Sequence, residues 1–217
     1  MHTEDRARFK KIGEKGDAKL HGKTVAVAGI GSVGSSIATI LAREDIDLRI
    51  VDMGRVEETD MHRLALFYEE DITKFKVKQA KARLAAINPK VHVKSFHEEL
   101  AGSNIFLLEG DCIVDATNND DINRLTLVHA AKKKYPLVMV RCSGAAVRIL
   151  VLHKSVSAKI LDKVALPPTE KDGIFGPATT LAATIAVTQV MRSLLGDKQN
   201  LLIACDAWEP KVKITKL

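Results

Sequence analysis

The chain has 217 residues, of which 46% are hydrophobic, 28% charged and 4% aromatic. This length suits one α/β domain with its own buried core, and the composition excludes a disordered, collagen-like or disulfide-scaffold protein. The 33 Lys and Arg residues against 27 Asp and Glu residues give a net charge of +6, which suits an acidic partner, a nucleotide or a plain solvated surface. Because aromatic side chains are scarce, no stacking platform for nucleic acid is expected.

Cysteine usage and the apolar segments indicate the compartment. The three cysteines form no Cys-x-x-Cys pair, so no zinc site is expected, and their odd number suits a reducing compartment. The first residues are charged without the apolar core of a secretory signal, and no run of 18 apolar residues exists. The most apolar segment, residues 176–196, contains threonines, Gln189 and Arg192, which favour a buried helix. We therefore expect a cytoplasmic protein with no membrane partner.

Apolar runs alternate with helix-like segments along the chain, and no internal repeat is present. Helices are expected at residues 3–20, 33–44, 73–87, 119–134 and 176–196, with an irregular connection at residues 155–173. Strands are expected at residues 23–29, 47–52, 91–96, 111–117, 136–141, 146–154, 201–206 and 211–216. This order predicts a Rossmann-like, doubly wound α/β fold with a mostly parallel sheet and antiparallel C-terminal strands. We expect one domain, residues 1–217, made of an N-terminal helix (1–20), a nucleotide-binding core (21–154) and a C-terminal helix with strands (155–217).

A glycine-rich turn follows the first predicted strand and opens the next predicted helix. It reads Gly29-Ile30-Gly31-Ser32-Val33-Gly34, the pattern in which glycines let a phosphate approach the backbone and the helix N-terminus attracts negative charge. Asp52 ends the second strand, where a carboxylate accepts hydrogen bonds from ribose hydroxyls. The turn therefore predicts nucleotide binding, and NAD and ATP both fit it.

Two basic residues follow the second strand, near the edge where ligands bind in such folds. Arg63 and Lys76 are suited to a triphosphate, which carries more negative charge than the pyrophosphate of a dinucleotide. From spacing alone, however, the interpretation of Arg63 and Lys76 as two of the many basic residues of a solvated face is favoured.

Five segments follow the glycine loop in order and read V-D-M-G-R-V-E, T-D-M-H-R-L, D-I-T-K-F-K, I-N-P-K-V-H-V and D-A-T-N-N. Through these segments the stretch from residue 20 to about residue 148 resembles the ThiF/MoeB/HesA family, which is related to the adenylation domain of ubiquitin-activating enzymes. Ser143-Gly144-Ala145-Ala146 and Gly173-Ile174-Phe175-Gly176-Pro177 resemble two further family segments. This ordered set is far more specific than the glycine turn alone.

The resemblance implies an ATP-dependent reaction with Mg²⁺, in which the C-terminal glycine carboxylate of a small ubiquitin-like or sulfur-carrier protein is adenylated. It also implies a homodimer, in which Arg6, with Arg8 as the competing candidate, is donated to the neighbour's ATP. Arg63 and Lys76 would stabilise the phosphates as pyrophosphate leaves. The residues that it places at the nucleotide are Gly29, Gly31, Ser32, Gly34, Asp52, Asp60, Arg63, Lys76, Asn118 and Asn119.

The chain departs from the family pattern at four positions: Gly54, Asp60, Leu64 and Asn118. Two of these bear on the metal ion. Asn118 stands where the family has its magnesium-binding aspartate, and a neutral amide is a poorer ligand for this ion. Asp60 stands where the family has an asparagine. One hypothesis is that Asp60 supplies the lost carboxylate, so that Asp60 and Asn118 together hold Mg²⁺. The alternative is a degenerate enzyme that keeps the fold and some nucleotide affinity.

Many relatives carry a reactive cysteine in a loop after the sixth strand, and residues 155–175 contain none. Cys142 ends a strand near the proposed site, where it is either a reactive thiol or, more simply, a small buried residue. We therefore expect a minimal enzyme that stops at the acyl-adenylate. The alternatives are a non-catalytic partner of a carrier protein or active paralogue, and an NAD-dependent oxidoreductase, for which no catalytic His or Tyr-Lys constellation is found.

Overall fold

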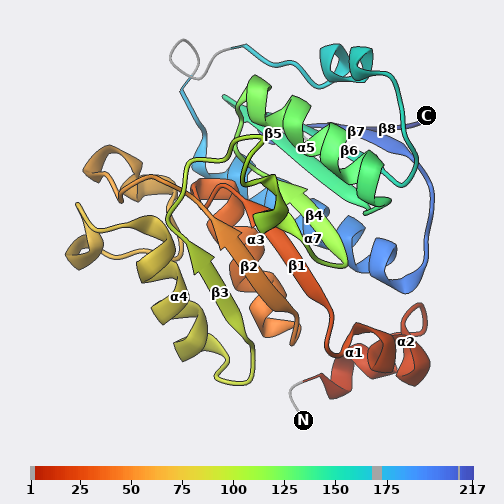
Figure 1. Ribbon diagram of the computed structural model, residues 1–217, viewed down its shortest axis with the longest axis horizontal. Coiled ribbons are helices and arrows are strands. Elements are labelled where there is room, and N and C mark those ends of the chain that lie inside the picture. The colour runs from red at the N-terminus through yellow and green to blue at the C-terminus, as the bar shows by residue number, and fades with distance from the viewer. Residues whose placement is uncertain (1–2, 168–172, 210) are drawn as a thin grey trace.

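The computed structural model describes residues 3–167, 173–209 and 211–217, which form an eight-stranded mixed sheet with helices on both faces (Figure 1). The strand order is β3-β2-β1-β4-β5-β6-β7-β8. The first five strands in this order are parallel, and β6, β7 and β8 continue the sheet antiparallel. The predicted fold class, including the antiparallel C-terminal strands, is therefore confirmed.

The elements have the following bounds. The strands are β1 (Thr24–Ala28), β2 (Asp47–Val51), β3 (Val93–Phe96), β4 (Cys112–Asp115), β5 (Leu137–Ser143), β6 (Ala146–Leu152), β7 (Leu201–Asp206) and β8 (Lys211–Lys216). The helices are α1 (Glu4–Arg8), α2 (Gly13–Leu20), α3 (Ser32–Arg43), α4 (Lys76–Ile87), α5 (Asp120–Lys133) and α7 (Gly176–Leu195). Four short 3-10 helices are η1 (Glu58–Arg63), η2 (Glu69–Asp71), η3 (Ile105–Leu108) and η4 (Ala158–Lys163).

The sheet separates two apolar layers. Figure 1 shows α3 and α7 on one face of the sheet and α5 on the other. Side chains alternate along each strand, so Val25 and Val27 of β1 face α3 while Ala26 and Ala28 face the α5 side. All four are fully buried, as a strand covered on both faces requires.

The predicted helix over residues 3–20 is wrong, because the segment forms two short helices. Gly13 has a φ of +63°, a left-handed conformation that glycine adopts freely and that no α-helix continues through. The helix predicted from residue 73 likewise begins later, at Lys76. Thr73 has a φ of +70° and donates its N–H to the carbonyl of Val56, which holds it outside the helix.

The long apolar helix α7 packs against α3 and against β5 and β6. Its small residues Ala178, Ala182 and Ala186 recur every four positions and are fully buried, which lets the helix approach its neighbours closely. By length and composition α7 also passes as a membrane span, but half of its most apolar stretch is buried within the molecule, as in the core helix of a globular protein. Gly196 ends it in the left-handed conformation usual for this position.

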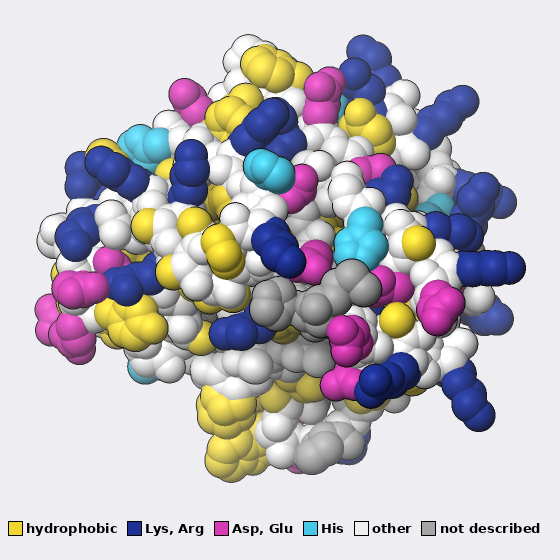
Figure 2. Space-filling model, turned by 90° about the horizontal axis from the view of Figure 1, so that it is seen from below, with side chains coloured by type: hydrophobic (Ala, Val, Ile, Leu, Met, Phe, Trp, Pro, Cys, Tyr) yellow, Lys and Arg dark blue, Asp and Glu magenta, His cyan; other side chains and the backbone are white. Residues whose placement is uncertain are grey.

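The basic side chains do not gather into one patch on the face that Figure 2 shows. Lys and Arg are interspersed there with Asp, Glu and His, and a hydrophobic group projects at the lower edge. On this face the basic residues are therefore solvated surface residues rather than a single basic patch.

Candidate functional site

The glycine turn between β1 and α3 is closed so tightly that side chains are excluded from two of its positions. Gly29 has a φ of +84°, and a Cβ there would lie 3.0 Å from the carbonyl oxygen of Ala116. A Cβ on Gly34 would overlap the carbonyl oxygen of Gly29. The turn thus brings the end of β1, the start of α3 and the loop after β4 into direct contact. No side chain caps α3, which begins at Ser32, so its first N–H groups face outward as a site for an anion.

Asp52 lies directly after β2 and fixes the two loops around it. Its Oδ2 accepts a hydrogen bond of 2.6 Å from the N–H of Ile30, and its Oδ1 accepts one of 2.6 Å from the N–H of Gly54. Each carboxylate oxygen has a second lone pair, so these bonds leave Asp52 able to accept from a ribose. The side chain therefore positions the glycine turn as well as facing the pocket beside it.

A pocket of about 330 Å³ opens where the strand order reverses, between β1 and β4. Gly29 and Gly31 of the glycine turn line it together with Asp52 and Lys76. The other predicted residues, apart from Asn119, are not among the lining residues: Ser32, Gly34, Asp60, Arg63 and Asn118. The pocket also includes residues that were not predicted: Met53, Glu98, Glu99, Leu100, Thr117 and Ile122. Residues 98–100 follow β3, so the rule that ligands bind at the carboxyl ends of parallel strands could have pointed to them. Asn119, which was predicted, lines the pocket and caps the N-terminus of α5 through its side-chain oxygen.

Asp60, Arg63 and Lys76 form a largely buried charge cluster. Asp60 pairs with Arg63 through one carboxylate oxygen, and its other oxygen is 3.3 Å from the Nζ of Lys76. Lys76 stands at the start of α4, where its N–H bonds to the carbonyl of Gly54 beside the pocket. The structure thus brings these three predicted residues together and engages both oxygens of Asp60 with cations.

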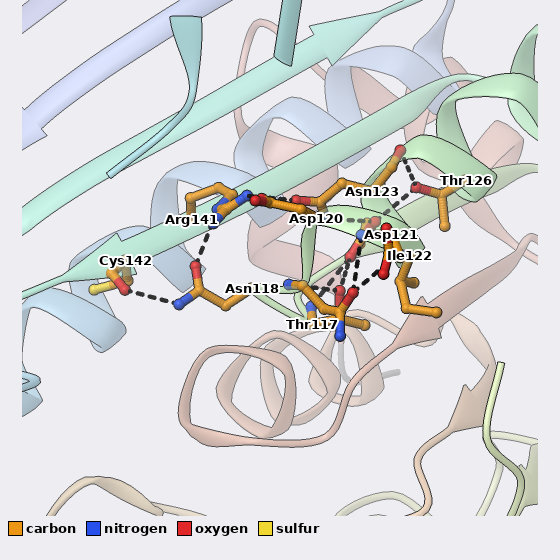
Figure 3. Close-up of polar contacts among 11 residues, drawn as sticks. Thr117, Asn118, Asp120, Asp121, Ile122, Asn123, Thr126, Arg141 and Cys142 are labelled. Carbon is orange, nitrogen blue, oxygen red and sulfur yellow. Dashed lines mark hydrogen bonds and ion pairs between the residues drawn. The ribbon is translucent and has the colours of Figure 1, made fainter. Parts of the chain in front are cut away.

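Asn118 belongs to a second polar network, on the β5 side of the same sheet edge (Figure 3). Its Oδ1 accepts a bond of 3.1 Å from the Nε of Arg141, and its Nδ2 donates to the carbonyl of Cys142 at 3.4 Å. Arg141 also bonds to Asn123 at 2.8 Å and pairs with Asp120. Arg141 was not predicted, and nothing in the sequence connects it with Asn118 without the pairing of β4 and β5.

The two expected Mg²⁺ ligands do not fit a metal ion held by the protein. Mg²⁺ is usually bound to a protein through one or two accessible carboxylate oxygens, with waters and substrate phosphates completing its shell. The carboxylate of Asp60 is occupied by Arg63 and Lys76, and the amide oxygen of Asn118 faces a guanidinium. Across the described parts of the chain, no three His, Cys, Asp or Glu side chains are arranged to hold a metal.

The three cysteines are free thiols, and all three are buried. Burial raises the pKa of the Cys142 thiol to about 11, although the charge of Arg63 opposes this shift. Burial also raises the pKa of Cys112, to about 12, and that of Cys205. Because the thiolate is the nucleophile, the simpler interpretation of Cys142 as a buried core residue is the one that the structure favours.

Arg6 lies far from the pocket of its own chain. Its guanidinium bonds to Asp17 at 2.6 Å and to the carboxylate of Glu44 at 3.0 Å. Glu44 follows the C-terminus of α3, a helix about 18 Å long whose other end is at the pocket. Only 6% of the Arg6 side chain is exposed, whereas Arg8 is 76% exposed and pairs with Asp5. The donation of Arg6 to a neighbouring subunit stays a prediction.

The sequence matches the model of the ThiF family over residues 3–217. The chain belongs to the ThiF family. It is 29% identical to the sulfur carrier protein ThiS adenylyltransferase of Bacillus subtilis, with 93% of this chain and 63% of that protein covered. It is 26% identical to a sulfur carrier protein adenylyltransferase of Thermus thermophilus, with 92% and 80% covered. This ThiF-family chain therefore spans less than two thirds of the length of its Bacillus relative.

Solved structures share the fold of this ThiF-family chain. Escherichia coli MccB with MccA-N7isoASN superimposes with a TM-score of 0.84 at 17% identity, and the match covers all of this chain and 72% of MccB. MccB with ATP superimposes with a TM-score of 0.79 at 18% identity, covering 92% of this chain and 65% of MccB. At such identities the likeness establishes the fold alone.

Proposed function

We propose that this chain binds ATP and adenylates the C-terminal glycine of a small ubiquitin-like or sulfur-carrier protein, releasing pyrophosphate. The observation that carries the proposal is the pocket in which the closed glycine turn and Asp52 meet the charge cluster of Lys76 and Arg63. The names of the Bacillus and Thermus relatives support a sulfur-carrier substrate, and the ATP complex of MccB supports the nucleotide.

The reaction follows from what each group does at this edge of the sheet. A carboxylate oxygen of the carrier attacks the α-phosphorus of ATP, the bond from that phosphorus to the β-phosphate oxygen breaks, and pyrophosphate departs with its charge. The N–H groups at the start of α3 bind phosphate oxygens, and Asp52 accepts from the ribose. Lys76 and Arg63 stabilise the negative charge that develops on the leaving group. Because the expected ligands do not fit, no step depends on a protein-held Mg²⁺, and any Mg²⁺ accompanies the nucleotide.

ATP suits this pocket better than NAD. Lys76 lines the pocket and Arg63 is joined to it through Asp60, and two cations match the charge of a triphosphate. Hydride transfer to or from a hydroxyl group needs a catalytic acid or base near the cofactor. Among the described residues that line the pocket there is no histidine and no tyrosine.

The buried thiols support a minimal reaction that ends at the acyl-adenylate. With all three cysteines buried, no thiol of the described chain is available to take the acyl group, so the nucleophile that consumes the product comes from outside the described residues. We further propose a cytoplasmic homodimer, as expected for the family. One observation favours the alternative of a non-catalytic carrier-binding partner: Asp60 neutralises part of the positive charge that a triphosphate needs.

The test is calorimetric titration with ATP and separately with NAD, in buffer containing Mg²⁺. We expect ATP binding that Lys76→Ala removes, and no binding of NAD. The matched control is Lys78→Ala, because Lys78 is exposed on the same helix and does not line the pocket. Pyrophosphate exchange with candidate carriers then tests the chemical step. Carrier binding without ATP binding would favour the non-catalytic partner, and NAD binding alone would contradict the proposed site.

A further inference from the structure

We propose that Asp60 serves this site as an internal substitute for a phosphate group. It binds Lys76 and Arg63 while the site is empty, yields them to the nucleotide, and takes them back as pyrophosphate leaves, so that it promotes release of this product. Asp60 is then a positioning residue, because it acts on the ligand only through the two cations. The proposal rests on the proposed function, and it extends that function from the chemical step to the step that follows.

The two oxygens of the Asp60 carboxylate contact two different cations. One oxygen pairs with the guanidinium of Arg63, and the other is 3.3 Å from the Nζ of Lys76. Phosphate oxygens bind guanidinium and ammonium groups through the same charge-assisted hydrogen bonds as carboxylate oxygens do. The empty site therefore already contains an anion, supplied by the chain itself, in contact with the two cations that we assign to the phosphates.

The Asp60 carboxylate is not anchored to the backbone. Among the described residues, its hydrogen-bond and ion-pair partners are Arg63 and Lys76 alone. The carboxylate of Asp52 differs, because backbone N–H groups hold both of its oxygens. A rotation of the Asp60 side chain thus releases both cations without breaking a bond to the backbone. A group that alternates with a ligand requires this freedom.

Lys76 is the cation through which Asp60 reaches the pocket. Lys76 lines the pocket, whereas Asp60 and Arg63 are not among the lining residues. Gly54 also lines the pocket, and a Cβ on Gly54 would lie 3.8 Å from the Nζ of Lys76. The ammonium is therefore shared between the pocket and Asp60. An anion that binds this ammonium comes close to the carboxylate, and because the two like charges repel, each weakens the binding of the other.

Water screens this competition only in part. The exposed fraction of the side chain is 14% for Asp60, 22% for Arg63 and 13% for Lys76. Largely buried charges are screened less than exposed ones, whose pairs contribute little. We therefore expect that removing the carboxylate charge of Asp60 changes the affinity for an anion. Removing an exposed carboxylate of the same 3-10 helix should not.

The competition affects the product more than the substrate. ATP is held by its ribose and base as well as by its phosphates, whereas pyrophosphate is held through its charge. A carboxylate that competes for the cations therefore weakens the binding of pyrophosphate more than that of ATP. Because product release limits the turnover of many enzymes, such a carboxylate favours the forward reaction.

The test is calorimetric titration of the wild type and Asp60→Asn with inorganic pyrophosphate, in Mg²⁺ and again in EDTA. We expect the affinity of Asp60→Asn for pyrophosphate to exceed that of the wild type about tenfold in both buffers, because the two cations lose their internal counter-ion. The affinity for ATP should rise by a smaller factor. A merely structural role would lower both affinities. Asp60→Ser, which also lacks the charge, is measured if Asp60→Asn fails to fold.

Two further variants assign the effect to the proposed contact. Glu58→Gln is the matched control, because Glu58 is exposed on the same 3-10 helix and pairs with neither cation. It removes the same charge and should leave the affinity for pyrophosphate unchanged. In a Lys76→Ala background, Asp60→Asn should give a smaller gain than in the wild type, because the shared ammonium is gone.

The outcomes separate this proposal from the proposed function. An unchanged or lowered affinity for pyrophosphate in a folded Asp60 variant overturns the internal anion, and so does an equal gain in Glu58→Gln. An undiminished gain in the Lys76→Ala background overturns the action through Lys76. If the wild type binds no ATP in either buffer, the proposed function fails. A higher affinity of Asp60→Asn for pyrophosphate would then still support the internal anion.

Discussion

Replacing Gly34 by alanine is the sharpest single test of the glycine turn. The added Cβ would lie 2.9 Å from the carbonyl carbon of Gly29, overlap its oxygen and lie 3.4 Å from the Cβ of Ala116. Because these atoms belong largely to backbone, no side-chain rotation relieves the overlap. The turn between β1 and α3 must open by about 1 Å before the methyl group fits.

Gly34→Ala is expected to lower both the stability of the protein and its catalytic efficiency. Overpacking of a closed site costs about 1–3 kcal/mol of unfolding free energy, and each kcal/mol lowers the melting temperature by about 2–4 °C in a protein of this size. A displacement of about 1 Å at a phosphate-binding backbone lowers catalytic efficiency about a hundredfold. We therefore expect a folded protein with a lower melting temperature and pyrophosphate exchange reduced about a hundredfold.

Two further alanine variants make the assay specific. A Cβ on Gly31 meets nothing within 4 Å, but Gly31 lines the pocket, so Gly31→Ala keeps its melting temperature and loses ATP affinity. Gly102→Ala, also with open space around the new methyl group, changes neither quantity. Thermal denaturation and ATP calorimetry measure both effects. Wild-type ATP affinity in Gly34→Ala would refute the argument that the closed turn forms the phosphate site.

Three further predictions concern the charge cluster, the N-terminal ion pair and the thiols. Asp60→Asn frees Lys76 from its counter-ion, so we expect ATP affinity to rise severalfold in calorimetry, whereas a metal-holding Asp60 would make it fall. Although burial opposes the shift, the hydrogen bond and charge of Arg6 lower the pKa of Asp17. This pair therefore stabilises the protein above about pH 4 and ceases to do so as pH falls through the lowered pKa. In urea unfolding at pH 7 we expect Asp17→Asn to lower the free energy of unfolding by about 3 kcal/mol, and we expect this loss to shrink toward pH 3. Iodoacetamide at neutral pH should leave Cys142 unmodified until the protein unfolds, and its rapid alkylation would contradict the buried thiol.

Much of the fold follows from local sequence patterns. The apolar runs, the glycine turn and the Asn-Pro stop locate the strands and helices because periodicity and turn chemistry act over a few residues. The splitting of the N-terminal helix at Gly13 and the late start of α4 after Thr73 were not predicted. In both cases a left-handed backbone, held at Thr73 by a bond to the carbonyl of Val56, overrides helix propensity.

The sequence by itself determined the mostly parallel α/β class, the glycine turn with Asp52 after the next strand, and the nomination of Arg63 and Lys76. Each of these depends on residues close in the chain or on an ordered family pattern. Only the tertiary structure decided what these side chains contact. Asp60 is paired with the two cations, and Asn118 is held by Arg141. These partners come from elements that meet only at the carboxyl edge of the folded sheet, and the charge and orientation of a polar group depend on what lies within a few ångströms of it.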